Sequence, residues 1–123
     1  MEKIKTFKEL KIWKKGITLT IEIYNLASQF PEEEKFGIIS QMQRAATSVS
    51  ANIAEGWRRK HTKEFIHFLH ISLGSLAELE TFLEISKKLK YIQNIENFDK
   101  ILSIIHELQK MIYTMLKSLS ANL

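Results

Sequence analysis

Helix-breaking residues are scarce in this sequence, and their scarcity limits the possible folds more than any other feature. The chain of 123 residues contains one proline, Pro31, and four glycines. An all-β sandwich requires many turns, which depend on these residue types, so long helices are favoured. Hydrophobic residues make up 45% of the chain and charged residues 26%, a balance typical of a folded globular domain. We therefore predict one domain, residues 1–123, built from helices.

Apolar residues recur at helical spacing in four segments separated by three short breaks. The predicted helices cover approximately residues 7–29, 35–55, 62–90 and 97–119. The expected end signals are the Thr6–Glu9 capping box, Pro31 as a stop, Gly56 as a C-cap, Thr62 as an N-cap, and Asn94 or Asn97 as another N-cap. Gly74, inside the third helix, is expected to let the second helix approach closely.

Four helices joined by short connections stack most simply as an all-α, up-down-up-down, left-handed four-helix bundle. The N-terminus, the loop near residue 60 and the C-terminus then share one end. The first predicted helix has two apolar faces and so requires two partners. Its stripes are Leu10, Trp13, Ile17, Ile21 and Tyr24 and, roughly opposite, Ile12, Leu19, Ile23, Leu26 and Phe30. One stripe suits the monomer core, and the other indicates a contact between subunits.

Residues 41–56 contain the most specific pattern in the chain. It reads Gln41-x-x-Arg44-Ala45-x-x-Ser48-Val49-x-x-Asn52-Ile53-Ala54-Glu55-Gly56. Together with Leu10, Trp13 and Phe30-Pro31 in the first helix, this pattern resembles a four-helix-bundle family linked to intervening sequences in bacterial 23S ribosomal RNA. The same fold family includes the accessory variability protein of diversity-generating retroelements.

The resemblance extends over nearly the whole chain. It implies a homo-oligomer, pentameric in known members, and it implies no established catalysis. The retroelement relatives bind nucleic acid and a reverse transcriptase. Ser72 departs from the alanine that is usual in the family at that position.

A polar stripe along one face of the second helix is the first candidate site. Its members are spaced three or four residues apart: Gln41, Arg44, Ser48, Asn52 and Glu55. Antiparallel pairing with the third helix places Arg44 near Glu78, and Ser48 near Gly74-Ser75. We interpret these residues as a buried hydrogen-bond network that fixes helix register and oligomer geometry. A ligand or catalytic site is the alternative interpretation.

Basic residues at one end of the bundle form the second candidate site. They are Arg58, Arg59, Lys60 and Lys63 in and after the second loop, and Lys3, Lys5, Lys8 and Lys11 near the N-terminus. Phosphate backbones bind such surfaces with release of counterions, and Trp57 could stack on an unpaired base. The alternative is a solvated charged loop in which Trp57 covers the end of the bundle.

Several classes of site are absent from the sequence. Without cysteine, the chain has no disulfide, thiolate zinc site or cysteine nucleophile. It lacks a glycine-rich phosphate loop and a nucleophile elbow, so we predict no enzyme activity and no cofactor. Glu64 and His67 match one half of a di-iron motif, but no second copy exists, so no metal is predicted. No segment reads as a signal peptide or membrane span, so a cytoplasmic location is expected.

The predicted function is therefore that of a non-enzymatic, oligomeric protein that binds the backbone of RNA or DNA through its basic end. The alternative is a protein–protein adaptor or scaffold, for example for a polymerase or a reverse transcriptase, without direct nucleic-acid binding. A steep dependence of binding on salt would distinguish the first function from the second.

Overall fold

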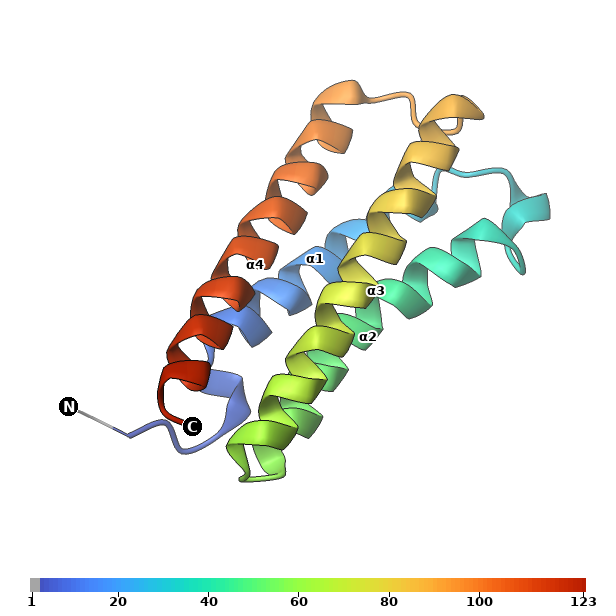
Figure 1. Cartoon of the computed structure of the whole chain (residues 1–123). Coiled ribbons are helices and arrows are strands. Elements are labelled where there is room, and N and C mark those ends of the chain that lie inside the picture. The colour runs from blue at the N-terminus through green and yellow to red at the C-terminus, as the bar shows by residue number, and fades with distance from the viewer. Residues whose placement is uncertain (1–2) are drawn as a thin grey trace.

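The computed structural model describes residues 3–123, which form four α-helices and two short 3-10 turns. The elements are η1 (Phe7–Glu9), α1 (Lys11–Ala27), η2 (Glu32–Glu34), α2 (Ile38–Arg58), α3 (Thr62–Lys88) and α4 (Ile95–Ala121). The helices run alternately up and down and pack side by side (Figure 1), and the described residues contain no strand. The all-α four-helix bundle predicted from the sequence is confirmed.

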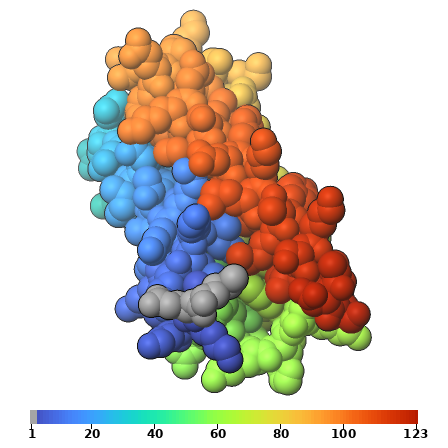
Figure 2. Space-filling view, turned by 90° about the vertical axis from the view of Figure 1, so that its left-hand side faces the viewer, coloured from blue at the N-terminus to red at the C-terminus, as the bar shows by residue number. Residues whose placement is uncertain are grey.

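The topology determines which segments meet at each end of the bundle. The N-terminal segment, the α2–α3 loop and the last turn of α4 gather at one end (Figures 1 and 2). The α1–α2 connection, which contains η2, and the α3–α4 connection lie at the other end. There the Tyr91 hydroxyl donates a hydrogen bond of 2.7 Å to Oε2 of Glu34, which links the two connections.

All four helices contribute to one apolar core. The following core side chains are at most 2% exposed: Ile12, Leu19, Ile23, Leu26, Met42, Ala46, Val49, Ile53, Leu69, Leu76, Leu79, Leu83, Phe98, Ile101, Ile105, Leu108 and Ile112. On α1 the core stripe is therefore the one that begins at Ile12. The other stripe divides, because Leu10 is buried and Trp13 half-buried, whereas Ile17, Ile21 and Tyr24 stay 39%, 57% and 46% exposed.

The first helix begins four residues later than predicted. The capping box is present, since Thr6 accepts from the backbone N–H of Lys8 and Glu9 accepts from that of Thr6. It closes the 3-10 turn η1, however, because Leu10 is extended (φ −69°, ψ 129°) and separates η1 from α1. This bend brings the Phe7 ring edge-on to Trp13, with 5.5 Å between the ring centroids.

Two of the predicted caps are wrong, and one is correct. Gly56 lies inside α2, which continues to Arg58, and the chain then reverses at Lys60 with a left-handed φ of 60°. Thr62 is the first residue of α3, and the preceding His61 takes the N-cap position without a side-chain hydrogen bond. Asn94 does cap α4, because its Oδ1 accepts from the backbone N–H of Asn97 at 3.0 Å.

Close helix approach occurs at other glycines than the one predicted. Gly74 is exposed, and a Cβ placed there would meet nothing within 4 Å. A Cβ at Gly56 would instead lie 2.6 Å from Cβ of Phe68 on α3, and one at Gly16 would collide with Oγ of Ser50 on α2. The prediction for Gly74 is wrong because its face of α3 points away from α2.

Candidate nucleic-acid interface

The structure brings the basic residues of two distant chain segments to the same end of the bundle. We call this surface the basic end, and its exposed cations are Lys3, Lys5, Lys8, Lys11, Arg58, Lys60, Lys63 and Lys117. Within residues 3–123, none of these eight side chains forms an ion pair. Their charges therefore face solvent without a carboxylate to neutralise them.

Local structure explains why cations are stable at this end. Arg58 belongs to the last turn of α2, where the partial negative charge of the helix C-terminus favours a positive side chain. Lys60 occupies the left-handed turn immediately after that helix. On the N-terminal side, Oε2 of Glu9 accepts hydrogen bonds from the backbone N–H groups of Lys5 (2.8 Å) and Thr6 (3.0 Å). These bonds hold the lysine-bearing segment against η1.

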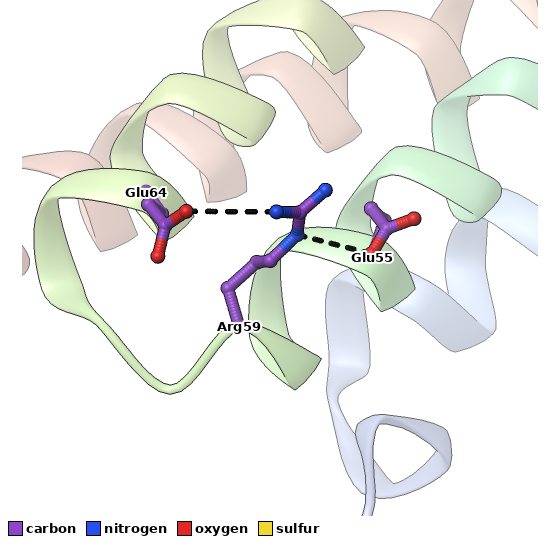
Figure 3. Close-up of polar contacts among 3 residues, drawn as sticks. All are labelled: Glu55, Arg59 and Glu64. Carbon is purple, nitrogen blue, oxygen red and sulfur yellow. Dashed lines mark hydrogen bonds and ion pairs between the residues drawn. The ribbon is translucent and has the colours of Figure 1, made fainter.

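Arg59 differs from the other predicted phosphate ligands (Figure 3). Its Nε lies 3.2 Å from Oε2 of Glu55, and one terminal guanidinium nitrogen lies 3.6 Å from Oε1 of Glu64. Its guanidinium carbon also lies 5.1 Å from the centroid of the Phe68 ring. Arg59 therefore joins α2 to α3 across their loop, and two carboxylates already offset its charge.

An open cavity of about 770 Å³ lies in the basic end. It is lined by the apolar or aromatic residues Ile4, Gly56, Trp57, Phe65 and Leu119, and by Lys3, Lys5, Lys60, His61 and Thr62. Trp57 and Phe65, which supply the aromatic side chains, are both half-buried. Sequence reasoning selected Trp57 and the lysines but missed Phe65 and His61. Their positions flanking the start of α3, at the loop that carries the cations, could have indicated them.

The predicted polar stripe lies along an open groove between α2 and α3. The groove, about 430 Å³ in volume, is lined by Gln41, Arg44, Ala45, Ser48, Ser75 and Glu78. The Ser75 hydroxyl donates to Oγ of Ser48 at 2.9 Å, and Nδ2 of Asn52 donates to the same Oγ at 2.9 Å. These contacts connect the two helices at the position that antiparallel pairing predicted for Ser48 and Ser75.

The remainder of that stripe is not a buried network. Gln41, Arg44, Glu55 and Glu78 are all exposed. Arg44 and Glu78 line the same groove, but no ion pair joins them. Glu55 is bound to Arg59 at the end of the bundle. The prediction of burial fails because the small side chains that close the α2–α3 contact leave the longer ones at its solvent-facing edge.

The surroundings of Ser72 explain why a serine is accommodated at this position. It is fully buried on α3, and its hydroxyl donates a 2.8 Å hydrogen bond to the carbonyl oxygen of Val49 on α2. A buried hydroxyl is costly unless it is paired, and this acceptor satisfies it. The departure from the alanine usual in the resembling family is thus accommodated by an added contact between helices.

The histidines do not assemble into a metal site in the described part of the chain. Among residues 3–123, no three His, Cys, Asp or Glu side chains converge closely enough to hold an ion. Glu64 contacts Arg59, and Nε2 of His106 lies 3.2 Å from Oε2 of Glu80. No helix in residues 3–123 combines the length and apolar character that a bilayer span demands.

Comparison with known proteins identifies one protein family and similar solved structures. The sequence profile of the 23S rRNA-intervening sequence protein family matches residues 8–114. Among solved structures, a protein with unknown function from the S23 ribosomal protein family of Bacteroides thetaiotaomicron is similar, with a TM-score of 0.78 and 28% sequence identity. The similarity covers 86% of this chain and 98% of that one. No curated protein matches the sequence.

Proposed function

Since the chain belongs to the 23S rRNA-intervening sequence protein family, we propose that it binds nucleic acid and that its basic end contacts the phosphate backbone of RNA or DNA. The observation that carries this proposal is the concentration of unpaired cations at one end of the bundle. Arg58, Lys60 and Lys63 come from the α2–α3 region, and the lysines near the N-terminus extend the same surface. We propose no catalytic step.

The distribution of charge over the bundle supports this function more than the net charge does. The net charge is only +4. However, the three consecutive acidic residues, Glu32–Glu34, lie at the opposite end of the bundle, where Lys87, Lys88 and Lys90 offset them in part. A surface of one sign attracts an oppositely charged polymer, and each phosphate contact lowers log K by about 0.9 per log unit of salt on duplex DNA.

Assembly into a homo-oligomer would repeat the basic end and strengthen its field. The exposed α1 side chains Ile17, Ile21 and Tyr24 support such assembly, because an apolar stripe exposed on a helix commonly marks a contact with another protein. We propose that a second copy of the chain covers this stripe. The pentamer implied by the resemblance remains a prediction.

The proposal is tested by titrating structured RNA and duplex DNA at about 50 and 200 mM salt. The test variant replaces Arg58, Lys60 and Lys63 with glutamate and leaves Arg59 in place, because Arg59 joins the helices. The matched control replaces Lys35, Lys88 and Lys90, near the opposite end, with glutamate. It therefore changes the net charge by the same amount. Losing three phosphate contacts should flatten the slope of log K against log salt by about 2–3 in the test variant only.

The outcomes of this titration are distinct. Binding that is steep in salt and lost only in the test variant would support the basic end as the interface. Equal losses in both variants would mean that net charge, rather than this surface, governs binding. Absence of any binding at the lower salt would refute the proposed function.

A protein–protein adaptor is the second candidate function. It is favoured by apolar side chains exposed near the end opposite the cations, where Phe36 is 90%, Leu89 51% and Ile95 48% exposed. Large apolar side chains exposed to solvent can contribute to contacts with another protein. An adaptor without direct nucleic-acid binding would show no salt-dependent affinity for RNA or DNA in the titration above.

A further inference from the structure

The cavity in the basic end combines aromatic and cationic groups in one place. Trp57 and Phe65 contribute aromatic rings, and Lys3, Lys5 and Lys60 contribute positive charge. We propose that this cavity receives one unpaired nucleotide of a single-stranded RNA or DNA segment. This inference rests on the proposed function and adds to it a specific preference for unpaired over paired strands.

The dimensions and lining of the cavity suit a nucleobase. Its volume of about 770 Å³ falls within the range of about 300–1,000 Å³ usual for small-ligand pockets. Trp57 and Phe65 are half-buried and line the cavity, and every base presents a flat face on which an aromatic ring can stack. The Phe65 ring packs closely on Gly56, because a Cβ at Gly56 would lie only 3.1 Å from Cδ1 of Phe65.

The charged groups around the cavity suit the phosphate of the same nucleotide. None of the residues that line it in the described part of the chain is acidic. Its lysines come from both sides: Lys60 from the left-handed turn after α2, and Lys3 and Lys5 from the N-terminal segment. The hydrogen bond from the backbone N–H of Lys5 to Glu9 fixes that segment beside the cavity.

The aromatic rings and the lysines together determine which ligand suits the cavity. A regular duplex buries the faces of its bases in stacking, so it can offer the cavity only phosphates. A loop, bulge or single strand can turn one base out of the stack, and proteins that recognise such bases place them on aromatic side chains. An acidic protein segment would match the lysines but would leave the two rings without a planar partner.

The experiment compares two fluorescently labelled single strands of equal length with wild-type protein, measured by anisotropy at one salt concentration. One strand carries all its bases, and the other is abasic throughout, so the phosphate count is identical. A stacked base contributes enough for abasic substitution to weaken binding about 5- to 160-fold. A duplex of the same length should bind no better than the abasic strand when affinity is expressed per phosphate.

Two variants place the effect at the cavity. Trp57→Leu should lower affinity for the base-bearing strand toward that of the abasic strand and should leave affinity for the abasic strand unchanged. Trp13→Phe is the matched control, because Trp13 packs against Phe7 and does not line the cavity. It should keep the full preference for bases.

The results separate this inference from the proposed function. Equal, salt-dependent affinity for the base-bearing and abasic strands would overturn the nucleotide site and leave backbone binding intact. No binding to either strand at low salt would overturn both. Displacement of the strand by an acidic peptide but not by a second base-bearing strand would also overturn the site, in favour of a protein ligand. The strand comparison uses wild-type protein, so the inference is testable even if Trp57→Leu does not fold.

Discussion

Replacement of Gly56 by alanine probes the packing of α2 on α3 directly beneath the candidate interface. The new Cβ would lie 2.6 Å from Cβ of Phe68 and 3.1 Å from Cδ1 of Phe65. Non-bonded carbon atoms normally sit about 3.5–4.0 Å apart. Because the Cβ of Phe68 is fixed to the backbone and cannot rotate away, the two helices must separate locally to admit the methyl group.

The magnitude follows from two opposing terms. Overpacking of this kind costs about 1–3 kcal/mol, whereas alanine in place of a helical glycine recovers about 0.8–1 kcal/mol. We expect Gly56→Ala to lower the free energy of unfolding by about 1–2 kcal/mol, since the clash involves a Cβ atom. Gly74→Ala is the matched control, because it is exposed on a helix with nothing within 4 Å of its new Cβ. It should raise the free energy of unfolding by about 0.8–1 kcal/mol.

Thermal and urea unfolding of both variants, followed by far-UV circular dichroism, would measure the difference. It should reach about 2–3 kcal/mol, which corresponds to about 6–15 °C in melting temperature for a chain of this size. The protein concentration must be held constant, since the stability of an oligomer depends on it. If Gly56→Ala stabilised the protein as much as Gly74→Ala, the close approach of α2 and α3 at Gly56 would be refuted.

Two further predictions concern the exposed α1 stripe and the opposite end of the bundle. Ile21→Glu should reduce the mass of the assembly measured by light scattering, because it places a charge where we propose that a second copy packs. The control is Glu22→Gln, at the neighbouring position that is already charged, and it should leave the mass unchanged. The hydrogen bond that Tyr91 donates to Glu34, followed by burial and the charges of Glu34 and Glu33, raises the pKa of Tyr91 above its usual value of 10.0. The neutral hydroxyl is thus favoured by folding, so its stabilisation is complete below pH 10.0 and is lost as pH rises through the raised pKa. Subtracting the ultraviolet titration of Tyr91→Phe from that of the wild type should reveal one phenol that ionises late, and a difference curve centred at or below pH 10.0 would contradict the contact.

Much of the fold followed from local sequence signals. Helical periodicity separated the four helices, Pro31 marked the end of the first, and Asn94 marked the start of the last. These signals act over a few residues, so they do not depend on what the helix packs against. The ends that were misplaced lie at Leu10 and Gly56. Leu10 bends the chain so that Phe7 packs on Trp13, and Gly56 packs closely against Phe68 of α3.

The candidate site was only partly readable from the sequence. The positions of Lys60, Lys63 and Trp57 at the loop end followed from topology alone. The i,i+4 spacing of Glu55 and Arg59 could have indicated their ion pair, but the contact of Arg59 with Glu64 forms only when the loop folds α3 back beside α2. The sequence also did not reveal that the lysines and rings line one open cavity.

The sequence by itself determined that the chain forms an up-and-down helical bundle and that its basic residues collect at one end. Both properties arise from the period of the helix and the order of the segments, which are encoded along the chain. Only the tertiary structure decided which glycine admits a neighbouring helix, which arginine is left unpaired, and which stripe of α1 stays exposed. Those outcomes depend on the rotation and register of each helix against its neighbours, and these are set by the packing of all four helices together.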